Sequence, residues 1–125
     1  MYGLPPDIDL SFLLGWKLIQ LAFGEHQVIL RFNREADLQN LTISVEATSL
    51  SLTLPEGNSN TWSDVLQSAG FLVALIGQHI VQASGTPSGT LTLGFNGGGV
   101  LKIHDDNARY ESYQITQGDT VKIIV

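Results

Sequence analysis

The sequence contains no cysteine, few basic residues and no long apolar run. The absence of cysteine excludes disulfide scaffolds, zinc sites built on thiolates and cysteine nucleophiles, and it is typical of a reducing compartment. No stretch approaches the roughly 18 apolar residues that a membrane-spanning helix requires, and no N-terminal segment has the pattern of a secretion signal. We therefore expect a cytoplasmic protein that does not associate with membranes.

Basic residues are too few and too scattered to predict a nucleic-acid-binding surface. Twelve acidic residues against six lysines and arginines give a formal net charge of −6, and the six never cluster in the sequence. Binding to phosphate backbones needs a basic stripe, so we expect no nucleic-acid partner. The acidic balance instead favours a basic protein partner, because charge complementarity steers association.

The length of 125 residues and the content of 13 glycines and 4 prolines predict one folded domain spanning residues 1–125. An internal repeat organises it. Residues 13–15 (Leu-Leu-Gly) recur 62 positions later as Leu-Ile-Gly, and residues 28–33 recur at an offset of 63. Leu41 and Ile43 match Leu101 and Ile103 at an offset of 60. Repeat 1 is predicted at about 8–54, a linker at 55–60, repeat 2 at about 61–116 and a terminal strand at 120–125.

We interpret this repeat as a duplication with a pseudo-twofold relation. The alternative is that alternating strands resemble one another by chance, and the shared Gly and Gln at matching positions argue against it. Within each copy, helical spacing comes first. Thr61 is expected to cap a long helix that ends at Gly77, and Asp9 or Ser11 a short one that ends at Gly15. Gly70, inside the long helix, is expected to pack closely against a strand.

After each predicted helix the apolar period drops to two, which is typical of antiparallel strands with one buried face. Asn96-Gly97 predicts a tight hairpin, and residues 117–119 predict a turn between two terminal strands. The predicted fold class is α+β: about eight or nine short antiparallel strands, one long helix and one short helix. The pattern leaves open whether the strands form one curled layer or two facing layers.

The densest polar cluster is His104-Asp105-Asp106-Asn107, followed by Glu111. His104, Asp106 and Glu111 could ligate a metal ion, and Glu111 with Asp105 or Asp106 could form an acid–base pair in a cleft. An ordinary loop explains the same residues, because Asp and Asn favour turns. The glycine-rich segment 94–99 lacks the Lys-Ser/Thr ending of a phosphate-binding loop. We therefore assign no catalytic residue, cofactor or metal.

Tyrosines beside this cluster are the better candidates for an interface, because aromatic side chains often anchor one. Trp16 and Trp62, at predicted element starts, are expected to cap the edge of the core instead. The candidate binding residues are Asp105, Asp106, Tyr110, Glu111 and Tyr113.

Short motifs along the chain carry a resemblance to a known family. They are Leu75-Ile76-Gly77, the alternations Leu91-x-Leu93-x-Phe95 and Leu101-x-Ile103-x-Asp105, and above all Tyr110-Glu111-Ser112-Tyr113. The chain resembles, over nearly its full length, a family of small uncharacterised bacterial proteins with a closing Y-E-S strand. The resemblance implies no assigned activity. Some relatives look like immunity proteins of toxin systems, and this implies an inhibitor of a protein partner.

Two functions follow from the sequence. The first is a small binding protein, in the form of an immunity-type inhibitor of a basic partner, with Asp105, Asp106, Tyr110 and Glu111 on an exposed face. The alternative is a small-molecule binder or enzyme that uses a groove between the two repeats. We also expect a homodimer, because apolar strands at the C-terminus leave sheet edges that need covering.

Overall fold

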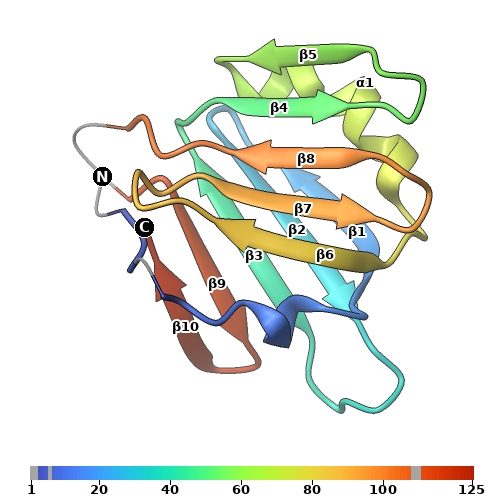
Figure 1. Cartoon of the computed structure of the whole chain (residues 1–125), viewed down its shortest axis with the longest axis vertical. Coiled ribbons are helices and arrows are strands. Elements are labelled where there is room, and N and C mark those ends of the chain that lie inside the picture. Colours follow the sequence, from blue (N-terminus) through green and yellow to red (C-terminus); the bar gives the residue numbers. More distant parts are fainter. Residues whose placement is uncertain (1–2, 6, 108–110) are drawn as a thin grey trace.

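The computed structural model describes residues 3–5, 7–107 and 111–125, which form two antiparallel sheets that face each other (Figure 1). The first sheet has the strand order β1-β2-β3-β9-β10 and the second has the order β5-β4-β8-β7-β6. The strands are β1 (Lys17–Phe23), β2 (Gln27–Asn33), β3 (Leu41–Glu46), β4 (Leu50–Thr53), β5 (Ser59–Trp62), β6 (Ile80–Gly85), β7 (Leu91–Phe95), β8 (Val100–Ile103), β9 (Tyr113–Gln117) and β10 (Thr120–Ile124). The described residues thus hold ten strands, more than predicted, and two facing layers.

Alternation along the inner strands β2, β3, β4, β8 and β9 produces the core between the sheets. Val28, Leu30 and Phe32 are fully buried on β2, and the corresponding positions of β7 are buried in the same way. The side chains between these buried positions on the inner strands are partly or fully exposed, as the period of two predicts. The predicted antiparallel strands and their buried faces are therefore confirmed, and the broad α+β class holds.

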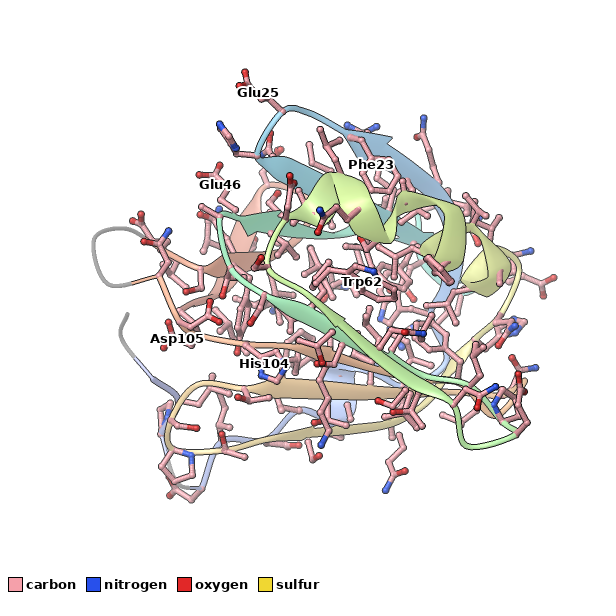
Figure 2. All side chains as sticks on the ribbon, turned by 90° about the horizontal axis from the view of Figure 1, so that it is seen from above. Phe23, Glu25, Glu46, Trp62, His104 and Asp105 are labelled. Carbon is pink, nitrogen blue, oxygen red and sulfur yellow. The ribbon has the colours of Figure 1, made fainter. Side chains whose placement is uncertain are left out.

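The helical content is smaller than predicted. It consists of a 3-10 turn, η1 (Ser11–Leu13), and an 11-residue segment made of η2 (Val65–Ser68), α1 (Ala69–Leu72) and η3 (Val73–Leu75). This segment lies across the open side of the sandwich, where η2 contacts β2 and β5 (Figure 2). No helix among the described residues has the length and apolar character needed to cross a membrane.

The predicted cap of the long helix is wrong. Thr61 lies in β5, paired with Ser51, and residues 59–60 of the predicted linker belong to the same strand. This segment therefore pairs with β4 as a strand, and the helical segment begins after it. Asp64 is the cap, and its side chain accepts a hydrogen bond from the Leu66 amide at 3.0 Å. The shorter N-terminal turn is present, but its N-cap is Leu10 and not Asp9 or Ser11. Asp9 lies just before this cap and accepts a hydrogen bond from the Ser11 amide at 2.9 Å.

The two sheets are joined along one side by a short antiparallel pairing that we call the seam, residues 15–18 against 77–80. The Gly15 amide donates to the Ile80 carbonyl at 2.8 Å, and the Gly77 amide donates to the Leu18 carbonyl at 2.7 Å. Two further bonds, both 2.9 Å long, run from Ile80 to Trp16 and from Leu18 to Gln78. The four bonds form two pairs related by an offset of 62 residues. The bond from Gly15 to Ile80 corresponds to that from Gly77 to Leu18, and the other two bonds correspond in the same way.

The strand arrangement follows the same correspondence. β1, β2 and β3 lie in the first sheet and the hairpin β4–β5 in the second, while β6, β7 and β8 lie in the second and β9–β10 in the first. A bulge follows Leu18 in β1 and Ile80 in β6. Val28 pairs with Val45 in the first sheet, and Leu91 pairs with Ile103 in the second. Val28 and Leu91 are 63 positions apart in the sequence, whereas their partners Val45 and Ile103 are 58 positions apart. The sequence match at 60 therefore does not follow the register of these strands.

Two glycines of the helical segment differ in what they require. Gly77 has φ +92°, a left-handed conformation, with open space around a Cβ. A Cβ at Gly70 would also meet nothing within 4 Å, at an ordinary φ, so the expected close packing at Gly70 is wrong. Because neither position is crowded, the effect of a substitution on stability depends on the backbone conformation at each glycine.

We expect Gly77→Ala to lower the free energy of unfolding by roughly 1–2 kcal/mol, because L-residues avoid the left-handed region. Gly70→Ala should raise it by roughly 0.5–1 kcal/mol, because alanine favours a helix over glycine. Urea unfolding of both variants beside the parent measures the difference. Equal effects of the two substitutions would contradict this account.

Candidate functional site

Six of the twelve acidic residues lie on the connections at one end of the sandwich. We call this region the acidic end; it comprises residues 24–26, 46–49, 63–64, 104–107 and 111–112. Its acidic residues are Glu25, Glu46, Asp64, Asp105, Asp106 and Glu111. Glu25, Glu46 and Asp105 follow one another along one side of the molecule in Figure 2. The described part of these connections contains no lysine or arginine.

Asp106 fastens the crossover from β3 to β4. One carboxylate oxygen, Oδ1, accepts from the Ser49 amide at 3.0 Å and from the Thr48 hydroxyl at 2.5 Å, and Oδ2 accepts from the Ser49 hydroxyl. Partial burial of the Asp106 carboxylate raises its pKa, but hydrogen bonds from Ser49 and Thr48 and the charge of His104 outweigh it and lower the pKa. An ionised carboxylate is thus held in a fixed orientation at the surface.

Asp105 points the other way, into the protein. It continues the inward alternation of Leu101 and Ile103 beyond the end of β8 and is 6% exposed. Its two oxygens accept from the Gly3 amide at 3.0 Å and from the Ser112 hydroxyl at 2.7 Å. The predicted exposure of Asp105 is therefore wrong, and its carboxylate joins the N-terminal segment to the connection that precedes β9.

Tyr113 is also inside. It lies opposite Val45 on the buried face of β9, is 1% exposed, and donates its hydroxyl to the Gly89 carbonyl at 2.7 Å. Burial, and second the charge of Asp105, raise the pKa of Tyr113 far above its ordinary value. Its side chain stabilises the acidic end from within and is not available to anchor an interface. Tyr110, the other candidate tyrosine, lies outside the described residues.

Glu111 is exposed, as predicted, but its neighbour is a residue that the sequence analysis missed. Glu46, at the end of β3, lines the same hollow of about 230 Å³, together with Gln27, Ser44 and Gln114. The Glu46 amide donates to the Ser112 carbonyl at 2.9 Å, which brings the two segments together. Outward alternation along β3 could have indicated an exposed Glu46, but only the pairing of β3 with β9 places it beside Glu111.

A second hollow, of about 450 Å³, lies on the other side of the crossover. His104 Nε2 is 2.8 Å from the Ser51 hydroxyl, which is also 2.8 Å from the Thr61 hydroxyl. The residues around it are mainly hydroxyl-bearing: Ser49, Ser51, Thr61, Ser88, Thr90, His104, Asp105 and Asp106. Sequence reasoning missed Ser51 and Thr61, because they reach His104 only through pairing of β4 with β5 and β8.

The three residues of the metal interpretation are not brought together. His104 and Asp106 line the larger hollow, whereas Glu111 lines the smaller one. In the described part of the chain, no three His, Asp or Glu side chains gather closely enough to hold a metal ion. The geometry instead offers fixed hydrogen-bond acceptors and negative charge on both sides of one crossover.

Ala47, at the centre of that crossover, has φ +45°, in the left-handed region that non-glycine residues rarely adopt. Its amide donates to the His26 carbonyl at 3.0 Å, so the β1–β2 turn supports the crossover. A third hollow, of about 250 Å³, opens beside it between His26 and Asp64. All three hollows therefore border the segment 46–49.

Comparison of the chain with family models, with curated proteins and with solved structures finds no match. Function therefore has to be argued from the site.

We expect Asp106→Asn to lower the free energy of unfolding by about 1 kcal/mol at pH 7, because it removes charge-assisted hydrogen bonds at a partly solvated position. The lowered pKa places this stabilisation above the unfolded-state pKa of about 4, and it is lost as the pH falls through the folded-state pKa. Urea unfolding should show a larger difference at pH 7 than at pH 2, because the stabilisation decreases as the carboxylate becomes protonated. Asp119→Asn, in the β9–β10 turn, is the control and should change stability little; a penalty for Asp106→Asn as large at pH 2 as at pH 7 would contradict the assignment.

Proposed function

We propose that the protein binds a basic protein partner at the acidic end. The observation that carries the proposal is the convergence of Glu46 and Glu111 on one hollow, with the fixed carboxylate of Asp106 across the crossover. These carboxylates come from connections distant in the sequence. Rim charges of one sign accelerate association with a partner of the opposite sign and disfavour wrong partners.

The support beneath these carboxylates is rigid. Asp105 and Tyr113 are buried and hydrogen-bonded, and Thr48 is 1% exposed. A partner would therefore meet a surface that needs little ordering on binding, and this lowers the entropic cost of association. An inhibitor of a basic enzyme, of the immunity type that the sequence resemblance implies, fits such a surface. A cytoplasmic location belongs to the same proposal.

The alternative function, in a groove between the two repeats, finds less support. We propose that the two five-strand units arose by duplication, and the matched bonds of the seam and the matched bulges support this. The space between the units is packed with apolar side chains, among them Leu18, Phe32, Ile80 and Phe95. A small ligand shared by both repeats would therefore have to bind at the surface of the seam.

The location of the binding surface is tested with matched charge reversals. We expect Glu46→Lys with Glu111→Lys to weaken binding of a fluorescent nona-lysine peptide at least about tenfold, because two favourable charges become repulsive. Glu56→Lys with Asp119→Lys changes the net charge equally, at turns on the opposite end, and should weaken binding much less. Fluorescence anisotropy at low ionic strength measures both. Equal losses in the two double variants would place the attraction in the net charge and overturn the proposed surface.

We also propose a homodimer that covers the outer face of β10. Val121 and Ile124 are 48% and 45% exposed there, while a bulge between Val121 and Ile123 interrupts the strand edge. We expect light scattering after size exclusion to give twice 13.5 kDa at micromolar concentration, and Val121→Lys with Ile124→Lys to return the monomer mass. A parent protein of 13.5 kDa would contradict the dimer.

A further inference from the structure

The seam places two basic side chains directly opposite each other. Lys17 and His79 are antiparallel partners, and hydrogen bonds flank this pair on both sides without joining it. In such a non-hydrogen-bonded pair the side chains lie on one face of the sheet with their Cβ atoms about 5 Å apart. Trp16 and Leu18, the neighbours of Lys17, are fully buried, so Lys17 and His79 share the outer face.

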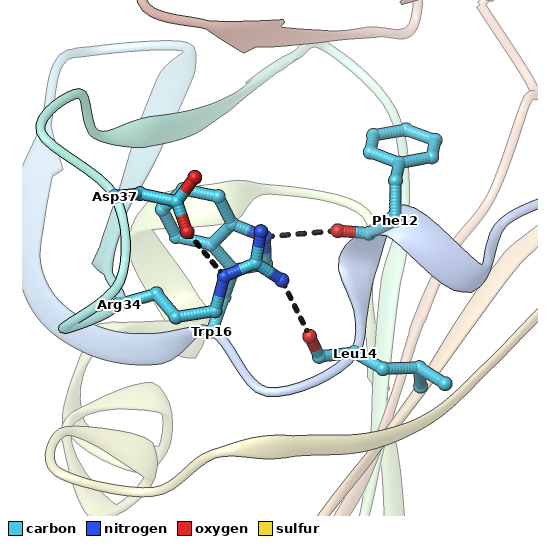
Figure 3. A network of polar contacts seen from close by, with 5 residues as sticks. All are labelled: Phe12, Leu14, Trp16, Arg34 and Asp37. Atoms are coloured by element: carbon cyan, nitrogen blue, oxygen red, sulfur yellow. Dashed lines mark hydrogen bonds and ion pairs between the residues drawn. The ribbon is translucent and has the colours of Figure 1, made fainter.

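A third basic group, Arg34, lines the same hollow as Lys17 and His79. Figure 3 shows the contacts that hold its guanidinium. Its guanidinium carbon lies 4.4 Å from the centre of the Trp16 ring, and Nη1 donates to the Leu14 carbonyl at 3.0 Å. Nε donates to Asp37 at 2.5 Å, and the Trp16 indole N–H donates to the Phe12 carbonyl at 2.9 Å. These contacts occupy only Nε and Nη1 of a group with five N–H donors, so the guanidinium keeps donors for a ligand.

All three basic residues line one hollow of about 360 Å³, whose other lining residues are Gly15, Asn33 and Glu35. The Lys17 ammonium and a ring N–H of His79 are both hydrogen-bond donors, so an oxyanion between them can accept from both sides of the seam. The convergence is notable in a chain with only six lysines and arginines and a net charge of −6. Glu35 in the lining and Asp37 beside Arg34 balance the charges of Lys17 and Arg34, so the hollow offers N–H donors without a large net charge. This suits a single oxyanion group and disfavours a polyanion.

We propose that this hollow binds the phosphate group of a small molecule, with Lys17 and His79 as its ligands from the two repeats and Arg34 as a fixed donor. The arginine fork and the lysine ammonium are the usual phosphate-binding groups. Asn33 adds an amide in the same lining. This site is independent of the acidic end, so either proposal can fail without the other.

The test titrates inorganic phosphate into the isotope-labelled protein at constant ionic strength and follows the NMR signals of Lys17, His79 and Arg34. We expect saturable shifts at these residues, and affinity weakened at least about fivefold in Lys17→Gln and in His79→Gln. Lys102→Gln, on the outer face of β8, removes a positive charge elsewhere and should leave the affinity unchanged. Tryptophan fluorescence, from Trp16 and Trp62, checks that each variant is folded.

Three results would overturn the proposal. They are the absence of saturation in the parent protein, an equal loss of affinity in Lys102→Gln, and binding of acetate as tight as that of phosphate. The first excludes a site, the second assigns the attraction to diffuse charge, and the third assigns the hollow to carboxylates. Phosphate binding that is tighter than acetate binding and is lost selectively in the two seam variants supports it.

Discussion

The pairing of residues 15–18 with residues 77–80 is the constraint on which both faces of the molecule depend. It joins the edges of the two sheets, β1 and β6, by backbone hydrogen bonds. Because side chains alternate along the paired segments, the same pairing sends Trp16 and Leu18 into the core and Lys17 to the surface. A shift of one residue would exchange these sets and bury a lysine. The seam therefore determines both which side chains enter the core and where the hollow lined by Lys17, Arg34 and His79 lies.

The acidic end depends on the same alternation, carried beyond the end of a strand. The inward series Leu101 and Ile103 continues to Asp105, whose buried carboxylate is satisfied by the Gly3 amide and the Ser112 hydroxyl. Asp106 must then face outward, where Thr48 and Ser49 bind it. One buried acid and one exposed acid thus have different tasks. Asp105 orders the connections and Asp106 presents charge on them.

Features that depend on neighbouring residues in the sequence, such as strands and tight turns, could be predicted. Alternation identified the strands and their buried faces, and the glycine turns after β7 and β9 follow from the sequence. The prediction of a long helix capped by Thr61 is wrong because Ser59–Trp62 forms a strand that pairs with β4. Asp106 and Glu111 could be identified as candidates because they belong to the densest polar cluster of the sequence, between β8 and β9. Their partners Glu46, Ser51 and Thr61 were missed because only long-range strand pairing brings them near.

The hollow at Lys17 and the acidic end lie at opposite ends of β1. β1 begins at Lys17 in the seam and ends beside the turn that carries Glu25, and its seven residues span about 20 Å. The Debye length at physiological ionic strength is about 8 Å, so exposed charges at this separation are largely screened from each other. The charges of Lys17 and Arg34 therefore do not neutralise those of the acidic end. The proposed anion site and the proposed surface for a basic partner can therefore coexist in a chain of net charge −6, because β1 separates them by its length.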